Sequence, residues 1–161
     1  MAGFAVDLLT TGGGPSFGRF AAAPDPSPLA LLQPAIDRCF AGDSVEAVLD
    51  ALAVEAAVGG AGAGWAAETR AGLLTKSPTS LKLTLRQLTI GRDYDLEAAL
   101  TLEYRMTQHV MAGRDFYEGV RAALIDKDQA PRWQPATLAE VSDDMIDAYF
   151  APIGDRELRF T

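Results

Sequence analysis

Helix-start signals, each followed by apolar residues at helical spacing, are the feature of this sequence that most constrains its fold. Asp43 stands three residues before Glu46 in "DSVEAVLDALAVEA", and Asp115 repeats this spacing with Glu118 in "DFYEGVRAALIDKD". The spacing is typical of a capping box, in which side chains at a helix start satisfy free backbone N–H groups. A third start is predicted at Ser77, because the proline after it fits the first position of a helix.

Apolar residues recur at intervals of three and four after these starts. Val45, Val48, Leu49 and Leu52 mark one face of the first helix. The other predicted faces are Leu81, Leu85 and Leu88; Leu96, Ala99, Leu100, Glu103, Thr107 and Val110, widened by Leu102, Met106 and His109; Phe116, Val120, Ala123 and Leu124; and, after a cap at Ser142, Met145, Ile146, Tyr149 and Phe150. No alternating β pattern exceeds a few residues, so the predicted fold is mainly α.

Glycine and proline divide the chain. Residues 1–30 contain "TTGGGPSFGRF" and "APDPSP" and are predicted to form a linker or irregular segment. Residues 31–161 are predicted to be the helical region, with a short first helix that Pro34 begins or kinks and another helix at 65–74. Glycines expected to end helices are Gly42, Gly91 and Gly113.

Charge and composition exclude several classes of function. Hydrophobic residues make up 48% of the chain, which is enough for a folded core. The net charge is −8, so we expect no binding to nucleic acid. No apolar run reaches the length of a membrane span, and no basic segment precedes an apolar one at the N-terminus, so we expect neither membrane insertion nor a secretory signal.

Cys39 and His109 are the only residues of their types. No disulfide can form within the chain, and zinc sites built from His and Cys are excluded within one chain. We expect Cys39 to be a small apolar core residue. His109 is a candidate general base, but no nucleophile or orienting group is evident near it, so a structural histidine is the favoured interpretation. The single thiol, the abundant alanine and the excess of arginine over lysine together predict a bacterial cytoplasmic protein.

Two further patterns are weighed against simpler explanations. "GAGWAA" at 62–67 matches a loose dinucleotide-binding pattern, but the segment before it is helical rather than a strand, so a helix–helix connection is favoured. Asp143, Asp144 and Asp147 could suggest a metal site, yet acidic residues at a helix start are explained by the helix dipole. We therefore predict no catalytic residue, metal or cofactor from these patterns.

Three stretches carry a resemblance to a known family: "KSPTSLKLTLRQL", "LEYRMTQHVMAGRDFYEGVRAALIDKDQAPRWQPATLAEV" and "YFAPIGDRELRF". Together with "IDRCFAGDSVEAVLDAL" they resemble the C-terminal region of 3-hydroxyisobutyryl-CoA hydrolases, in the crotonase (enoyl-CoA hydratase/isomerase) superfamily. The resemblance covers about residues 30–161. It implies the helical C-terminal region of a crotonase-like protein, without the ββα spiral core that carries the oxyanion hole and the catalytic acids.

The resemblance also implies a function and its partners. The chain would be the C-terminal portion of an acyl-CoA thioester hydrolase of valine catabolism, inactive without the core. The resemblance suggests Lys127 as a contact to coenzyme A, and a solvated surface lysine is the simpler and favoured interpretation. Expected partners are a crotonase-core polypeptide or a second copy held through an exposed apolar face, with acyl-CoA bound only when the core is present. Two alternatives stay open: a non-enzymatic binding or assembly module, and part of a related hydratase or isomerase.

Overall fold

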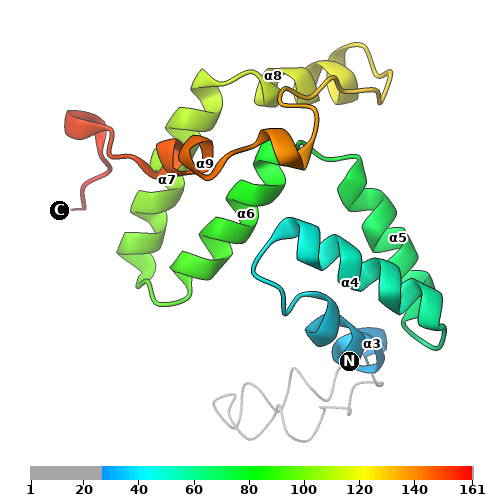
Figure 1. Cartoon of the computed structure of the whole chain (residues 1–161). Coiled ribbons are helices and arrows are strands. Elements are labelled where there is room, and N and C mark those ends of the chain that lie inside the picture. The colour runs from blue at the N-terminus through cyan, green and yellow to red at the C-terminus, as the bar shows by residue number, and fades with distance from the viewer. Residues whose placement is uncertain (1–26, 161) are drawn as a thin grey trace, which may run out of the picture. The chain divides into compact units, whose positions relative to one another are not determined.

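The computed structural model describes residues 27–160, and these residues contain helices and irregular segments but no strand (Figure 1). The α-helices are α3 (Pro28–Cys39), α4 (Val45–Val58), α5 (Ala63–Leu74), α6 (Pro78–Gly91), α7 (Leu96–Ala112), α8 (Asp115–Val120) and α9 (Asp143–Phe150). Three shorter helical turns are the π-helical η1 (Arg121–Ile125) and the 3-10 turns η2 (Leu138–Glu140) and η3 (Gly154–Arg156). The prediction of a mainly α fold is confirmed.

The chain forms two compact units that meet after Gln33, and the second unit begins at Pro34. Most of the predicted linker, residues 1–30, lies outside the described residues, so its boundary stays a prediction. Within residues 27–160, no helix has the length and apolar character needed to cross a bilayer.

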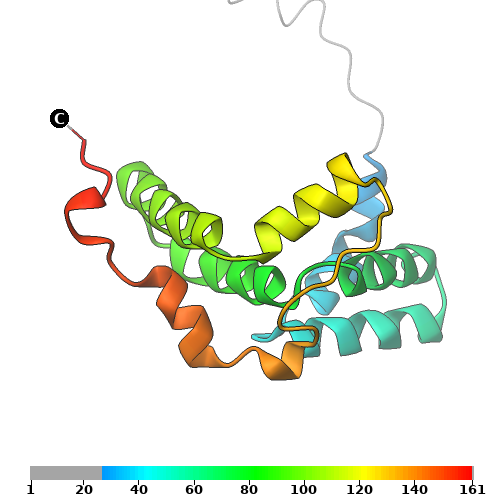
Figure 2. The same ribbon diagram turned by 90° about the horizontal axis from the view of Figure 1, so that it is seen from above.

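Two hydrophobic cores hold the helices that follow Pro34. Helices α4 and α5 lie side by side (Figure 2) and enclose a first core, here called the α4–α5 core. Helices α6, α7 and α9 enclose the second, the α6–α7–α9 core. The buried members of the α4–α5 core are Cys39, Val48, Leu52 and Ala66, and those of the α6–α7–α9 core are Leu83, Leu102, Met106, Val141 and Ile146.

The predicted face of α4 is confirmed, because all four of its residues are buried. The predicted face of α6 is wrong, since Leu83 is its buried leucine while Leu81 and Leu85 are half-buried and Leu88 is exposed. Helix α6 contacts α4 as well as α9, so it does not present one stripe to one neighbour. On α7, Leu102 and Met106 are buried but Leu96 is exposed.

Serine caps account for three of the helix starts. The Ser77 hydroxyl accepts a hydrogen bond from the Ser80 N–H at 3.1 Å, and Ser142 does the same for Met145 at 3.3 Å, as predicted. For α4 the predicted cap is wrong by one residue, because Ser44, not Asp43, accepts the Ala47 N–H at 3.2 Å. The extended backbone of Ser44 has the geometry of an N-cap residue.

The predicted glycine stops are confirmed at one of the two long helices. Gly113 ends α7 as predicted. Gly91, predicted to follow the helix, is instead the last residue of α6, and Arg92 is the C-cap. The arginine there has ordinary helical dihedral angles, so α6 does not need a left-handed glycine at its end.

Candidate functional site

The residues singled out from the sequence lie on different elements. Cys39 is at the end of α3, His109 is on α7, and Lys127 lies in the turn after η1. The Cys39 side chain is buried, and burial raises the pKa of its thiol, so the reactive thiolate is disfavoured. The His109 Nε2 atom lies 3.0 Å from the Ala151 carbonyl oxygen, and its ring meets Tyr149 edge-on. Both observations agree with the structural roles expected for Cys39 and His109.

Two residues of the acidic cluster of α9 lie where the helix-dipole explanation requires, and the third has a different partner. Asp143 and Asp144 lie in the first turn, and Asp147 accepts a hydrogen bond from Arg86 at 3.0 Å. Across residues 27–160, no three His, Cys, Asp or Glu side chains are grouped as metal ligands would be.

"GAGWAA" lies at a helix–helix connection, as favoured from the sequence. Gly62 precedes α5, and the element before it is α4 rather than a strand. A Cβ atom on Gly62 would stand 2.8 Å from the Ala35 Cβ and 2.8 Å from the Glu55 carboxylate. The glycine therefore permits close packing of the chain, and phosphate binding is not needed to explain it.

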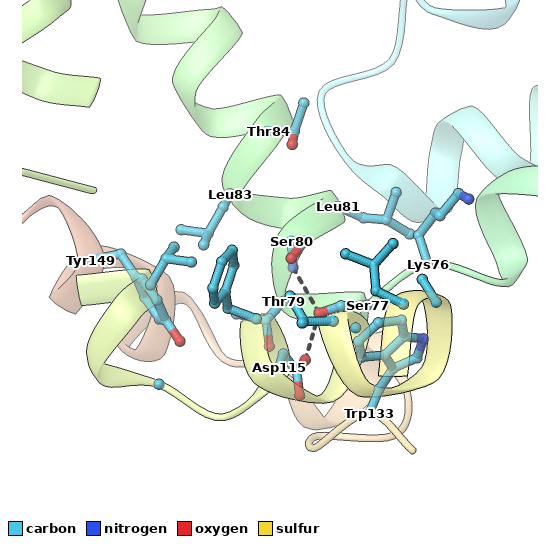
Figure 3. A pocket seen from close by; sticks show the side chains of 17 residues that line it. Lys76, Ser77, Thr79, Ser80, Leu81, Leu83, Thr84, Asp115, Trp133 and Tyr149 are labelled. Atoms are coloured by element: carbon cyan, nitrogen blue, oxygen red, sulfur yellow. Dashed lines mark hydrogen bonds between the residues drawn. The ribbon is translucent and has the colours of Figure 1, made fainter. Parts of the chain in front are cut away.

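A groove of about 600 Å³ lies in the part of the chain that the structure describes. Its walls come from α6, from the end of α7, and from α8 with η1, and most of its lining is apolar (Figure 3). A second hollow of about 400 Å³ lies beside it, and Leu83, Val110 and Phe116 line both. This combined space is called the α6–α8 groove below.

A polar cluster stands at one end of the α6–α8 groove. The Ser77 hydroxyl donates to the Asp115 carboxylate at 2.6 Å while accepting the Ser80 N–H (Figure 3). The other Asp115 oxygen accepts the Gln134 N–H at 3.0 Å. Desolvation, and secondarily the charge of Asp115, raises the pKa of Tyr149, which also lines the groove.

Two carboxylates of α8 hold residues 130–138, here called the strap. Asp115 accepts the Gln134 N–H, and Glu118 accepts the Arg132 N–H at 2.7 Å. The residue between them, Trp133, donates its indole N–H to the Thr75 carbonyl at 3.0 Å. Helix α8 thus binds two alternate N–H groups of the strap, and the tryptophan between them reaches the end of α5.

The caps predicted at Asp115 and Glu118 are wrong. Arg114 precedes α8, and no side chain there caps the helix. The carboxylates instead serve the strap, and hydrogen bonds from Arg121 and from the Arg132 N–H lower the Glu118 pKa from 4.5 to about 2. The sequence signal for this role was the "PRWQP" segment downstream, whose N–H groups needed partners.

Arg121 ties together the turn that carries Lys127. Its guanidinium donates to Asp126 at 2.6 Å, to Asp128 at 2.7 Å and to Glu118 at 2.8 Å. These hydrogen bonds raise the Arg121 pKa and lower that of Asp128. Lys127 is exposed and has a left-handed backbone conformation, with φ 57°. The residues on either side of it, Asp126 and Asp128, are both bound by Arg121.

The polar cluster of the groove pairs a hydroxyl with a carboxylate. The Ser77 hydroxyl has a carboxylate partner but no imidazole, since His109 does not line the groove. Thr79 also lines it, is 5% exposed, and has a hydroxyl with no hydrogen-bond partner among the described residues. The groove therefore offers mainly apolar surface, and the Thr79 hydroxyl oxygen is itself buried in its wall.

Comparison with known proteins gives consistent matches. A sequence model of the enoyl-CoA hydratase/isomerase family matches residues 16–150. The mitochondrial 3-hydroxyisobutyryl-CoA hydrolase of rat is 46% identical over 125 residues, which are 78% of this chain and 31% of the rat protein. Its counterpart in Xenopus laevis is 44% identical over 140 residues, which are 87% of this chain and 35% of that protein.

Solved structures agree with these sequence matches. A carnitinyl-CoA dehydratase from Mycobacterium thermoresistibile superimposes with a TM-score of 0.78 and 36% identity, over 99% of this chain and 44% of that one. The chain spans about a third of the length of the curated relatives and matches their C-terminal part. The resemblance inferred from the sequence, including its restriction to the C-terminal region, is confirmed.

The expectation of a bacterial cytoplasmic protein is contradicted by these relatives, which are mitochondrial proteins of vertebrates. The reasoning failed because alanine and arginine content does not report a compartment. A single cysteine also fits any setting in which disulfides are not maintained.

Proposed function

The chain belongs to the enoyl-CoA hydratase/isomerase family, and from this premise we propose that it acts as the C-terminal helical part of a 3-hydroxyisobutyryl-CoA hydrolase. The reaction would be hydrolysis of an acyl-CoA thioester in valine catabolism. The observation that carries this proposal is the 46% identity to the rat hydrolase over 78% of the chain. A related hydratase or isomerase is the less favoured reading, because the curated matches at this level are named as hydrolases.

The proposed activity requires the N-terminal part of the family's chain. Thioester hydrolysis needs preorganised donors for the developing oxyanion and an acid or base within hydrogen-bond reach. In the α6–α8 groove, the Ser77 hydroxyl both donates to Asp115 and accepts from Ser80, so its usual hydrogen bonds are already made. This favours a structural role for residues 27–160, and the proposal assigns the chemistry to the part of the family's chain that they do not match.

Lys127 is proposed to contact the phosphates of coenzyme A when the N-terminal part is present. Its exposure leaves the ammonium group accessible, and Arg121 hydrogen-bonds both flanking carboxylates, Asp126 and Asp128. Their charge is therefore directed toward the guanidinium rather than toward Lys127. A lysine binds phosphate as a point charge, so this contact would supply affinity more than orientation.

A thioesterase assay with 3-hydroxyisobutyryl-CoA tests the proposal. We expect no turnover by the purified chain, and turnover when the N-terminal part of the rat hydrolase is joined to it in one polypeptide. In that hybrid, Lys127→Ala should raise KM about fivefold with kcat unchanged, the effect of about 1 kcal/mol for one exposed charge pair. Arg92→Ala, which removes an exposed charge at the end of α6, is the matched control and should leave KM unchanged.

Two results would contradict this proposal. Turnover by the chain alone, removed by one substitution within residues 27–160, would show that the chemistry resides here. Failure of the hybrid on every acyl-CoA tested would favour the second candidate, a non-enzymatic binding module. That candidate is supported by the open apolar groove, which suits a macromolecular partner whether or not a reaction follows.

A further inference from the structure

A further hollow, of about 470 Å³, lies along the strap. Two arginines line it, Arg114 from the start of α8 and Arg132 from the strap itself, together with residues 133–136 and Glu140. Both arginines are exposed. A ligand can therefore reach the two guanidinium groups from solvent.

Neither guanidinium group has a carboxylate partner among the residues that the structure describes. The Arg114 guanidinium donates to the side-chain oxygen of Gln134, which is neutral, and the Arg132 side chain makes no hydrogen bond or ion pair there. Four other arginines each bind at least one carboxylate: Arg38, Arg86, Arg105 and Arg121. In a chain with a net charge of −8, two such guanidinium groups on one hollow point to an anion from outside the chain.

The carboxylates of α8 do not neutralise these arginines, because they already have other partners. Asp115 accepts the Gln134 N–H at 3.0 Å and a serine hydroxyl at 2.6 Å. Glu118 is bound by the Arg121 guanidinium at 2.8 Å and by the backbone N–H of Arg132 at 2.7 Å. The side-chain charges of both arginines in the hollow are therefore left without a counter-charge from this helix.

Glu140 is the acidic residue that lines the hollow. Its Oε2 atom accepts the N–H groups of Ala136 and Thr137, each at 2.9 Å. Hydrogen bonds from Thr137 and, less strongly, from the Ala136 N–H lower the Glu140 pKa, so the side chain is ionised at neutral pH. The hollow thus contains two positive charges and one negative charge, and Glu140 must weaken the binding of any anion there.

The strap holds this arrangement in place before a ligand binds. Three consecutive residues, Arg132, Trp133 and Gln134, are all anchored. The first and third donate their backbone N–H groups to carboxylates of α8, and the tryptophan donates its indole N–H at 3.0 Å to the end of α5. The backbone that carries Arg132 and the amide that holds Arg114 are therefore preorganised, which lowers the entropic cost of binding.

We propose that this hollow binds a phosphate dianion, with the guanidinium groups of Arg114 and Arg132 as its donors. A guanidinium group presents a planar fork of N–H groups that pairs with two oxygens of a phosphate. A phosphate monoester carries a charge of about −1.5 to −2 at pH 7, which matches two guanidinium groups, whereas a carboxylate carries one negative charge. The inference depends on the geometry and charge of the strap and not on the proposed function.

Titration of the full chain with inorganic phosphate tests the site, with the NMR signals of the arginine Nε–H groups as the readout. We expect the Arg114 and Arg132 signals to shift saturably, and acetate to bind about fivefold more weakly than phosphate. Arg132→Gln should weaken phosphate binding about 10-fold, the lower end of the range for a hydrogen bond to a charged group. Arg92→Gln is the matched control, because Arg92 is exposed, follows α6, and does not line the hollow.

Glu140→Gln should change the affinity in the opposite direction. Glutamine keeps a side-chain oxygen for the N–H groups of Ala136 and Thr137 but removes the negative charge from the hollow. Phosphate binding should therefore become about twofold to fivefold tighter. A variant that had lost its fold could not show this gain, so the result does not depend on the stability of the variants.

Glycerol 3-phosphate, titrated in the same way, separates two sources of the anion. Binding of this ester at least as tightly as inorganic phosphate assigns the site to an organic phosphate, and weaker binding of the ester assigns it to the free ion. Equal effects of Arg132→Gln and Arg92→Gln would overturn the proposal, because the effect would then come from the overall charge of the chain. Acetate binding as tight as phosphate binding, unsaturable shifts at Arg114 and Arg132, or weaker binding by Glu140→Gln would also overturn it.

Discussion

Replacing Ser77 by alanine should destabilise the chain far more than replacing the serine that caps α9. Ser77 makes two kinds of interaction, a cap to the Ser80 N–H and a 2.6 Å hydrogen bond to the Asp115 carboxylate, and it is buried. Ser142 is exposed and only caps, accepting the Met145 N–H at 3.3 Å.

The magnitudes follow from these contacts. Loss of a serine cap costs about 1 kcal/mol, which is the whole effect expected for Ser142→Ala. Loss of a hydrogen bond to a charged group adds about 1.5–3 kcal/mol for Ser77→Ala, so its free energy of unfolding should fall by about 2.5–4 kcal/mol. Asp115→Asn keeps an oxygen for the Gln134 N–H, and it should couple to Ser77→Ala by about 1–2 kcal/mol.

Urea unfolding of the four proteins in this double-mutant cycle, with Ser142→Ala alongside, measures both quantities. The urea midpoints should shift while the m-values stay equal. The reasoning fails if Ser77→Ala costs no more than Ser142→Ala, or if the two substitutions at Ser77 and Asp115 are additive. Either outcome would mean that Asp115 does not link α8 to the start of α6.

The remaining predictions concern the core of α6 and the acid sensitivity of the strap. Leu83→Ala should lower the free energy of unfolding by about 2–5 kcal/mol, and Leu85→Ala should lower it by clearly less because Leu85 is half-buried. Equal losses of unfolding free energy for the two variants in urea would contradict the assigned core. The Glu118 pKa is about 2 in the folded chain against an ordinary 4.5, so the ionised carboxylate stabilises the fold above pH 4.5, and this contribution should be lost as the pH falls toward 2. Fluorescence of Trp133 in a Trp65→Phe background should report this loss, and Glu118→Gln should flatten the pH dependence in that window; an unchanged acid profile would show that Glu118 does not hold the strap.

The sequence was sufficient where interactions are local. The face of α4, the caps at Ser77 and Ser142, and the end of α7 at Gly113 depend on residues within one or two helical turns, and all were predicted correctly. Each is settled by spacing and by backbone groups that are close in the sequence.

The sequence was insufficient where partners are distant. Leu83 packs with Val141 and Ile146, and no periodicity within α6 identifies residues so far along the chain. Asp115 and Glu118 have the spacing of a cap, but their hydrogen bonds go to Gln134 and Arg132. The groove is likewise a product of long-range packing, so it could not be located before the structure.

The separation of the two cores has a consequence for the order in which the chain folds. The α4–α5 core is built mainly by two consecutive helices, so only a short loop must close before its contacts form. The α6–α7–α9 core requires Ile146 to reach Leu83, a closure across a long stretch of chain. We expect the amides of the α4–α5 hairpin to become protected from exchange first during refolding or synthesis. Those of α6 should become protected only after α9 has formed and packed. Pulsed hydrogen exchange that shows α6 amides protected before those of α4 would contradict this order. If the α4–α5 hairpin does form first, the walls of the α6–α8 groove are among the last surfaces of the chain to fold.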